Sequence, residues 1–193
     1  MLGSAVSRRP VSLDHEKLRV FLTGNFQDYS RVESAFAGVD ACLFCLGVSA
    51  TRVSGEEEYR RITYGFAVAA ARALRAHSPG AAFHFISGQG TSLTSRFMWA
   101  RVKAETEREV MKLVDAVCWR PAAIDGAPSD NAPRAYKVLR PLFRILKPFR
   151  NLYVTGEDLG RAMLQATAEG MRGRIIENAE IREIAERSRQ EPR

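Results

Sequence analysis

The segment Ala41-Cys42-Leu43-Phe44-Cys45-Leu46 is apolar at every position and ends at Gly47. A continuous apolar run of this length is typical of a strand whose two faces are both covered, as in a parallel sheet. Residues 56–58 are glutamates that begin a long helical pattern extending to His77, and acidic side chains suit the positive end of a helix dipole. A second predicted strand, Ala81-Ala82-Phe83-His84-Phe85-Ile86-Ser87, follows. The order strand, helix, strand predicts a βαβ unit and a parallel sheet.

The same alternation extends in both directions from this unit. The predicted strands cover residues 2–7, 18–22, 41–46, 81–87 and 116–119, and the predicted helices cover residues 28–37, 56–77 and 95–113. Beyond Ile124 the pattern is looser. We expect a loop over 125–133, a basic and apolar segment over 134–149 that Pro141 and Pro148 interrupt, a helix over 155–168, an edge strand over 174–177 and a frayed helical tail over 183–193. The sequence therefore predicts an α/β fold.

Length and charge narrow the class of protein. The chain has 193 residues, which suits one domain with a substantial core. It carries 29 Lys and Arg against 22 Asp and Glu, so its net charge of +7 favours anionic partners such as nucleotides. The basic residues match no nucleic-acid recognition motif, so we expect no nucleic-acid binding. No apolar run is long enough to span a membrane and the first residues do not have the order of a secretory signal, which predicts a cytoplasmic protein.

The three cysteines, Cys42, Cys45 and Cys118, are predicted to be free thiols, because an odd number in such a chain does not form a disulfide framework. Cys42 and Cys45 form a C-x-x-C pair inside a predicted strand, where residues three apart face opposite sides of the sheet. With one such pair and no clustered histidines, the sequence predicts no metal site.

The ends of the predicted strands are the candidate ligand site, because open parallel sheets bind ligands outside the carboxyl ends of their strands. These ends carry small, polar or cationic residues that suit an extended phosphate-bearing ligand. They are Ser7-Arg8-Arg9, Gly24-Asn25-Phe26, Leu46-Gly47-Val48, Ser87-Gly88-Gln89 and Arg120-Pro121-Ala122. Arg8 and Arg9 can pair with phosphate oxygens, and a guanidinium also stacks on adenine. The alternative interpretation of the two arginines is a solvated turn beside Pro10.

Several segments, in their order and spacing, resemble the atypical short-chain dehydrogenase/reductases, closest to the Tat-interacting-protein-like and NAD-dependent epimerase-dehydratase groups. They are Cys45-Leu46-Gly47, Arg60-Arg61-Ile62-Thr63-Tyr64, Ile86-Ser87-Gly88-Gln89-Gly90, Trp99-Ala100-Arg101-Val102-Lys103-Ala104-Glu105 and Trp119-Arg120-Pro121. The resemblance extends from about residue 7 to residue 126, with a weaker match over 155–178. It implies a single NAD(P)-binding Rossmann-like domain over residues 1–193, with a doubly wound parallel sheet and a small C-terminal helical flap with edge elements over 127–193.

The resemblance also implies roles for the matching residues. Arg8 and Arg9 follow the strand after which basic residues bind the ribose 2′-phosphate, which favours NADP over NAD. As the catalytic pair, Ser87 would orient the substrate and Lys103 would hold the nicotinamide ribose. The implied cofactor-binding residues are Arg8, Arg9, Asn25, Phe26, Leu46, Gly47, Lys103, Pro121 and Ala122.

Two departures from the family pattern bear on activity. The family's catalytic tyrosine lies four residues before its lysine, and here that position is Trp99, whose indole N–H donates a hydrogen bond but cannot serve as the acid that a phenol provides. The family's first strand and its G-x-x-G-x-x-G turn, which binds pyrophosphate at a helix N-terminus, have no counterpart in the sequence. We therefore expect an N-terminally incomplete domain without the first β-α unit, weakened dinucleotide binding, and a sheet that is either broken or closed by the strand 2–7.

These observations predict an NAD(P)-binding protein that transfers hydride to or from a small carbonyl or alcohol substrate. One alternative, which Trp99 favours, is a catalytically inactive dinucleotide-binding or protein-interaction module. Another is binding to an anionic membrane surface through the basic segment 134–150. We favour a helical flap over the cleft for that segment, since its two prolines limit a long amphipathic helix. The sequence is compatible with either a monomer or a homodimer.

Overall fold

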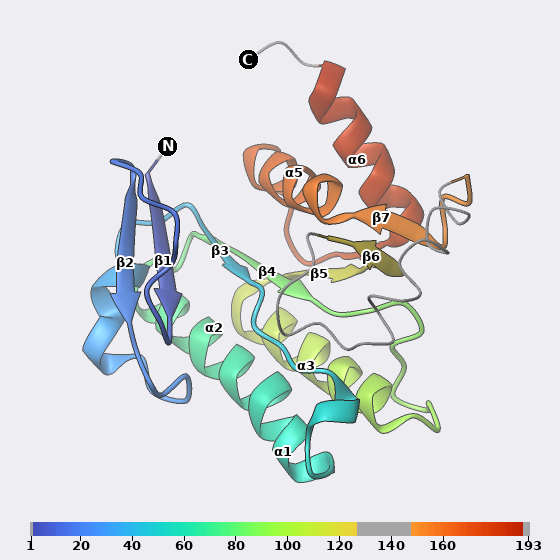
Figure 1. Ribbon diagram of the computed structural model, residues 1–193, viewed down its shortest axis with the longest axis horizontal. Coiled ribbons are helices and arrows are strands. Elements are labelled where there is room, and N and C mark those ends of the chain that lie inside the picture. Colours follow the sequence, from blue (N-terminus) through green and yellow to red (C-terminus); the bar gives the residue numbers. More distant parts are fainter. Residues whose placement is uncertain (1, 127–147, 191–193) are drawn as a thin grey trace.

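The computed structural model describes residues 2–126 and 148–190, and its strands alternate with helices along the chain (Figure 1). The strands are β1 (Gly3–Ser7), β2 (Leu18–Leu22), β3 (Ala41–Phe44), β4 (Ala82–Ile86), β5 (Val117–Arg120), β6 (Ala123–Asp125), β7 (Tyr153–Thr155) and β8 (Ile175–Glu177). The α-helices are α1 (Glu56–Arg60), α2 (Phe66–His77), α3 (Met98–Val114), α5 (Gly156–Ala168) and α6 (Asn178–Gln190). The shorter helical turns are η1 (Ser30–Phe36), η2 (Ala50–Arg52) and the π-helical η3 (Arg61–Gly65). The predicted α/β class is confirmed. Of the predicted flap and edge elements over 127–193, residues 127–147 and 191–193 lie outside the described residues, and so does most of the basic segment 134–150.

Four parallel strands form the main sheet in the order β3-β4-β5-β8. The strands β1 and β2 form a separate parallel pair, and so do β6 and β7. Within the described residues, β1–β2 and the main sheet share no strand pairing, although both pack against the same hydrophobic cluster. Of the two sheet arrangements that the sequence allows, the structure therefore has the broken one, and Gly3–Ser7 stays paired with Leu18–Leu22.

Helices cover both faces of the main sheet, with α2 and α3 on one side and α5 and α6 on the other (Figure 1). Successive side chains of β4 alternate between these faces, as strand geometry requires. Phe83 and Phe85 join the cluster under α2 and α3, whereas His84 faces the opposite side and stacks on Trp119 of β5. In β5, Cys118 lies on the first face and Trp119 on the second. The doubly wound arrangement is confirmed for this sheet.

The strand β3 is less covered than its apolar sequence predicts. Phe44 is buried, but Leu43 is 39% exposed and Cys45, which follows the strand, is exposed as well. Because β3 is the edge of the main sheet, one side of the strand has no neighbouring strand among the described residues. The prediction that both faces of this segment are covered is therefore wrong. The three cysteines are free thiols, as predicted.

The long helix predicted over 56–77 is confirmed, with one local change in its hydrogen-bonding pattern. It consists of α1, the π-helical turn η3 and α2 without a break, and the turn ends at Gly65. Glycine is about 1 kcal/mol less favourable than alanine inside a helix, so a local change of hydrogen-bonding pattern is least costly beside it. The acidic start of the helix is confirmed, because residues 56–58 form its first turn.

The C-terminal part is more ordered than the predicted frayed tail. Thr155 begins α5 as predicted, since its hydroxyl accepts a hydrogen bond of 3.0 Å from the Asp158 N–H, a cap that contributes about 1 kcal/mol. The helix α6 begins at Asn178, five residues before the predicted tail, and buries Ile181, Ile184 and Ala185. That spacing forms one apolar stripe along the helix. The predicted start at residue 183 is too late, because it leaves Ile181 outside the helix.

The buried side chain of Asn178 connects three segments that are distant in sequence. Its carbonyl oxygen accepts a 2.8 Å hydrogen bond from the Ala122 N–H. Its amide donates to the carbonyl oxygens of Arg150 at 2.6 Å and Tyr153 at 3.0 Å. Asn178 is only 1% exposed, so loss of these bonds would leave buried backbone groups unpaired. This residue fixes β6, β7 and the start of α6 relative to one another.

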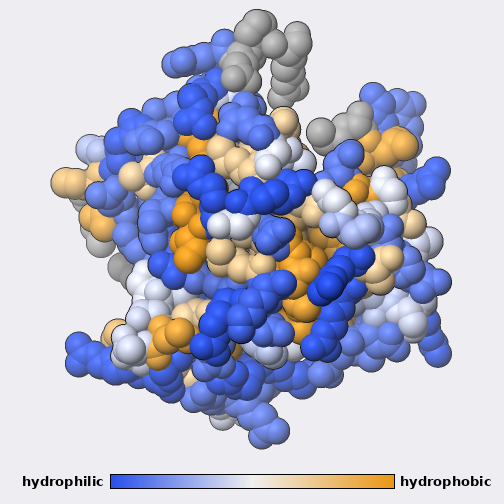
Figure 2. All heavy atoms as spheres, turned by 180° about the vertical axis from the view of Figure 1, so that it is seen from behind, coloured by the Kyte–Doolittle hydropathy of each residue, from blue (hydrophilic) through white to orange (hydrophobic). Residues whose placement is uncertain are grey.

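The surface agrees with the charged composition. Figure 2 shows hydrophilic side chains over most of the face opposite to that of Figure 1, with smaller apolar areas between them. None of the helices in residues 2–126 and 148–190 has the length and apolar character needed to cross a membrane.

His84 is a fully buried histidine with both ring nitrogens bonded. The Trp119 indole N–H donates to His84 Nδ1 at 3.1 Å, which places the imidazole proton on Nε2. That nitrogen lies 3.0 Å from the Thr167 hydroxyl, which itself donates to the Met163 carbonyl. Burial, aided by the charge of Arg172, lowers the pKa of His84 to about 4. The ring is therefore held in its neutral form.

This environment predicts a pH-dependent stability. Because the folded-state pKa lies below the unfolded value near 6.5, the contribution of His84 is complete above about pH 6.5 and is lost as the pH falls towards 4. The shift corresponds to about 3 kcal/mol over this window. We expect His84→Gln, which cannot titrate, to lose less unfolding free energy than the unmodified chain between these pH values. Urea denaturation at several pH values measures the difference, and a difference that does not change with pH would contradict the assignment.

Candidate functional site

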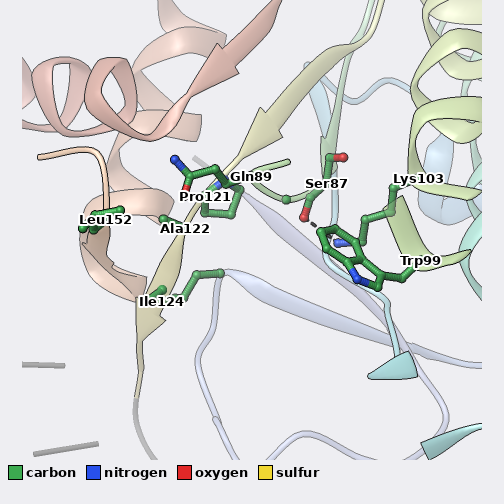
Figure 3. Close-up of a pocket in the computed structure, with 10 residues that line it drawn as sticks. Ser87, Gln89, Trp99, Lys103, Pro121, Ala122, Ile124 and Leu152 are labelled. Carbon is green, nitrogen blue, oxygen red and sulfur yellow. Dashed lines mark hydrogen bonds between the residues drawn. The ribbon is translucent and has the colours of Figure 1, made fainter. Parts of the chain in front are cut away.

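A cavity of about 500 Å³ lies at the carboxyl ends of β4 and β5 (Figure 3). Its wall combines the segment after β4, the first half of α3, the segment from the end of β5 into β6, and the residue before β7. The lining residues are Ser87, Gly88, Gln89, Trp99, Lys103, Pro121, Ala122, Ala123, Ile124 and Leu152. Apart from Lys103, Gln89, Ser87 and the indole N–H of Trp99, these residues are apolar or lack a polar side chain.

The floor of the cavity is held by hydrogen bonds that continue the β4–β5 pairing beyond the strand ends. The Ser87 N–H donates to the Trp119 carbonyl at 2.7 Å, and the Gln89 N–H donates to the Pro121 carbonyl at 3.0 Å. The Gln89 side-chain amide donates to the Asn151 carbonyl at 3.0 Å. The two strand ends are therefore fixed side by side, with the segment before β7 attached to them.

Lys103 and Trp99 project into this region from one face of α3, one helical turn apart. The Lys103 ammonium donates a 2.5 Å hydrogen bond to the Ser87 carbonyl oxygen, shown as a dashed line in Figure 3. A Cβ at Gly88 would lie 3.6 Å from Lys103 Nζ and 3.8 Å from the Trp99 ring. Gly90, whose φ of +82° favours glycine, lies beside the same ring. Trp99 therefore lies close over the glycine-containing segment.

Ser87 is buried, and its hydroxyl forms a hydrogen bond with a residue other than Lys103. The hydroxyl lies 3.1 Å from the Thr91 hydroxyl, which donates to the Gly88 carbonyl at 2.7 Å. Because Thr91 uses its proton on Gly88, the Ser87 hydroxyl is the donor of this pair. In Figure 3 the carbonyl oxygen of Ser87, rather than its hydroxyl, faces Lys103. A role in orienting a substrate would need the hydroxyl to leave Thr91.

Lys103 is a cation in a largely apolar wall. Burial lowers the pKa of Lys103 to about 8, and the negative charge of Glu107 opposes that effect in part. Glu107 itself is buried and binds Arg120 through two hydrogen bonds, of 2.9 and 2.7 Å. Arg120 also contacts Glu177 at 3.1 Å, and the paired carboxylates raise the pKa of the guanidinium. The carboxylate whose charge acts on Lys103 is therefore paired with Arg120.

The other predicted site residues lie outside the cavity wall. Arg8 and Arg9 are exposed after β1, and Asn25 is exposed with its side-chain oxygen accepting a 3.0 Å bond from the Gln27 N–H. Phe26 is 3% exposed, and its ring packs against Tyr29 and Phe66 in the core.

Leu46 and Gly47 follow β3 at the edge of the main sheet. Leu46 is partly buried against the core, whereas a Cβ at Gly47 would meet no atom within 4 Å. The structure thus brings together Ser87, Lys103, Pro121 and Ala122 with Trp99, and leaves the predicted residues from β1, β2 and β3 elsewhere.

Sequence reasoning missed the wall formed by Ala123, Ile124 and Leu152. Both β6 and β7 have only three residues, too few for a recognisable strand pattern. Their pairing also joins segments about thirty residues apart. A signal was nevertheless present in the apolar run of 122–124 directly after Pro121. Among the described residues, the side chains form no cluster of three or more His, Cys, Asp or Glu suited to a metal ion.

Several solved structures share this fold, and two of those described next are complexes with NADPH or NADP. RMD from Pseudomonas aeruginosa in complex with NADPH is 14% identical, with a TM-score of 0.58 over 86% of this chain and 70% of that one. Glucuronic acid dehydrogenase from Chromohalobacter salexigens is 12% identical, with a TM-score of 0.62 over 90% of this chain and 65% of that one. The dTDP-4-dehydrorhamnose reductase from Bacillus anthracis in complex with NADP is 12% identical, with a TM-score of 0.63 over 91% and 74%.

The chain thus spans about two thirds to three quarters of the length of these structures. Comparisons with protein-family models and with the sequences of curated proteins give no match. At these identities the likeness concerns the fold. The chain therefore has the Rossmann-like α/β fold of these dehydrogenase and reductase structures.

Proposed function

We propose that the chain binds NADP(H), with the nicotinamide end in the cavity at the ends of β4 and β5, and exchanges a hydride with a small carbonyl or alcohol. The observation that carries this proposal is the meeting of Lys103, Trp99 and Gly88 with Pro121 and Ala122 around one cavity. The complexes of similar folds with NADPH and NADP support the choice of ligand.

The residues of the cavity fit the nicotinamide half of a dinucleotide. An ammonium has three N–H donors, and Lys103 uses one of them on Ser87, which leaves donors for ribose hydroxyls. Ala122, Ile124 and Leu152 provide an apolar wall for the ring. When bound, the cofactor would supply or accept the hydride. The chain would position the ring, hold the ribose and limit the access of water.

We further propose a preference for NADP and a weak affinity. Arg8 and Arg9 are exposed at the end of β1, where their guanidinium groups could donate paired hydrogen bonds to a 2′-phosphate. The sequence contains no G-x-x-G-x-x-G turn, so backbone N–H groups of a glycine-rich helix start are not available to the pyrophosphate. The affinity would then depend mostly on the two arginines and on Lys103.

A second candidate function is dinucleotide binding without turnover, which Trp99 favours. Trp99 lies one turn before Lys103 on the same helix face and lines the cavity. Its N–H can donate a hydrogen bond to a carbonyl oxygen but does not release its proton to it. In this case the chain would bind NADP(H) in the cavity but would not catalyse reduction of a substrate.

Titration calorimetry with NADPH tests the binding proposal. We expect saturable but weak binding, and a loss of affinity of about ten- to a hundredfold in Lys103→Met, because a hydrogen bond from a charged group is worth about 1.5–3 kcal/mol. Lys112→Met is the matched control, since Lys112 is exposed on the same helix and should have no effect. The double variant Arg8→Ala with Arg9→Ala should weaken NADPH binding more than NADH binding. Equal affinities in all variants would contradict the assignment.

Substitution of Trp99 tests whether the chain lacks only its proton donor. Trp99→Tyr places a phenol one turn before Lys103, where the nearby ammonium favours its ionisation. We expect this variant to oxidise NADPH with small aldehydes or ketones about a hundredfold faster than the unmodified chain, the usual scale of a positioned acid. Trp99→Phe controls for the change in ring size and should give no gain. An unmodified chain as fast as the tyrosine variant would show that another acid serves the reaction.

A further inference from the structure

The Lys103 amine has few polar contacts for a lysine in a cavity wall. Among the described residues it forms no salt bridge, and its hydrogen bond goes to the neutral carbonyl oxygen of Ser87. Glu107, the acidic residue whose charge acts on it, is occupied by two hydrogen bonds from Arg120. The charge of Lys103 is therefore only partly compensated within this part of the chain.

The surroundings favour the neutral form of this amine. The cavity wall next to it includes Trp99, Ala122 and Ile124, which offer no hydrogen bond to an ammonium through their aliphatic or ring carbon atoms. With the pKa of Lys103 lowered to about 8, about a tenth of the side chain is the free base at pH 7. For a lysine with an ordinary pKa the fraction is about three in ten thousand. Neutral amine is the form that has a lone pair for reaction.

The approach to the nitrogen is open on the side of Gly88. The position that a Cβ would take at Gly88 lies 3.6 Å from Lys103 Nζ, so the missing side chain leaves space beside the amine. The cavity of about 500 Å³ that both residues line is large enough for a small aromatic or aliphatic molecule. A carbonyl group placed there would face Nζ with an apolar wall behind it.

We propose that Lys103 is a nucleophile that captures small apolar aldehydes in this cavity as imines. The Nζ lone pair forms a C–N bond to the carbonyl carbon, and the carbonyl π electrons move to oxygen, which takes up a proton as nitrogen loses one. The resulting carbinolamine loses its hydroxyl group and a proton from nitrogen as one molecule of water, leaving a C=N bond. Hydrolysis reverses both steps, so no oxidant, reductant or cofactor is consumed.

This capture does not require a dinucleotide and so stands apart from the proposed function. Both uses involve the same amine, because Lys103 would donate to ribose hydroxyls when NADPH is bound. NADPH and an aldehyde would then compete for the Lys103 amine. The competition gives a way to separate the two proposals in one experiment.

Reductive trapping tests the proposal on the full chain. The protein is incubated with benzaldehyde and cyanoborohydride at pH 7, and the labelled positions are found by intact mass and peptide mapping. We expect a benzyl group to form on Lys103 at least tenfold faster than on Lys112, at a rate that saturates with aldehyde concentration. Lys112 is the internal control, because it is an exposed lysine of the same helix. This comparison needs no variant and does not depend on whether a substituted chain folds.

Two variants refine the test. Lys103→Arg keeps the positive charge and should lose the label, whereas Lys112→Arg should keep it. Gly88→Ala adds a methyl group at ordinary contact distance from Nζ and Trp99, so it should slow labelling of Lys103 while circular dichroism stays unchanged. Labelling of Lys103 no faster than that of Lys112, or a rate that rises without saturation, would overturn the proposal.

The NADPH arm distinguishes the two proposals. If benzaldehyde labels Lys103 and saturating NADPH suppresses the label, both stand. Labelling that NADPH does not reduce supports the nucleophile and contradicts the nicotinamide position. Binding of NADPH without any preferential label on Lys103 contradicts the nucleophile alone.

Discussion

The pairing of β4 with β5 is the constraint on which the site depends. Its hydrogen bonds continue past the strand ends, from Ser87 to Trp119 and from Gln89 to Pro121. Since both strands are covered on both faces, their side chains fix which residues can point to the ends and which are held in the core. The cavity forms where this rigid pair stops and α3 passes over it. A polar or catalytic group can be held accurately there because the backbone beneath it is fixed.

Much of this framework could be predicted from residues near one another in sequence. The alternation of Phe83, His84 and Phe85 requires a strand with two buried faces, and β4 has that form. The predictions that were wrong or missing concern features that depend on contacts between distant segments. The apolar stripe of Ile181, Ile184 and Ala185 packs against α5, and this contact cannot be identified from α6 alone. The three-residue strands β6 and β7 form only by pairing with each other. Edge position, which leaves Leu43 exposed, is likewise a property of the sheet rather than of the strand.

The candidate site likewise contains residues that could be predicted from local sequence and residues that could not. Ser87, Pro121 and Ala122 follow neighbouring parallel strands, so their meeting at one edge is a consequence of topology that the sequence already indicates. Lys103 and Trp99 line the same cavity together, because they lie one helical turn apart on the same face of α3. Leu152 reaches the same wall through a segment that shows no pattern of its own. The predicted residues after β1 and β2 belong to a separate pair of strands, whose position relative to the cavity no local pattern can specify.

The hydrogen bonds of Asn178 have a consequence for synthesis of the chain. Ala122 and the segment before β7, which form one wall of the cavity, are tied to a side chain more than fifty positions after Ala122. During synthesis the strands β3, β4 and β5 leave the ribosome before Asn178 does, because the chain is delivered from its N-terminus. The cavity wall therefore closes only when α6 has begun to emerge. A nascent chain would carry its core well before it carries a complete pocket.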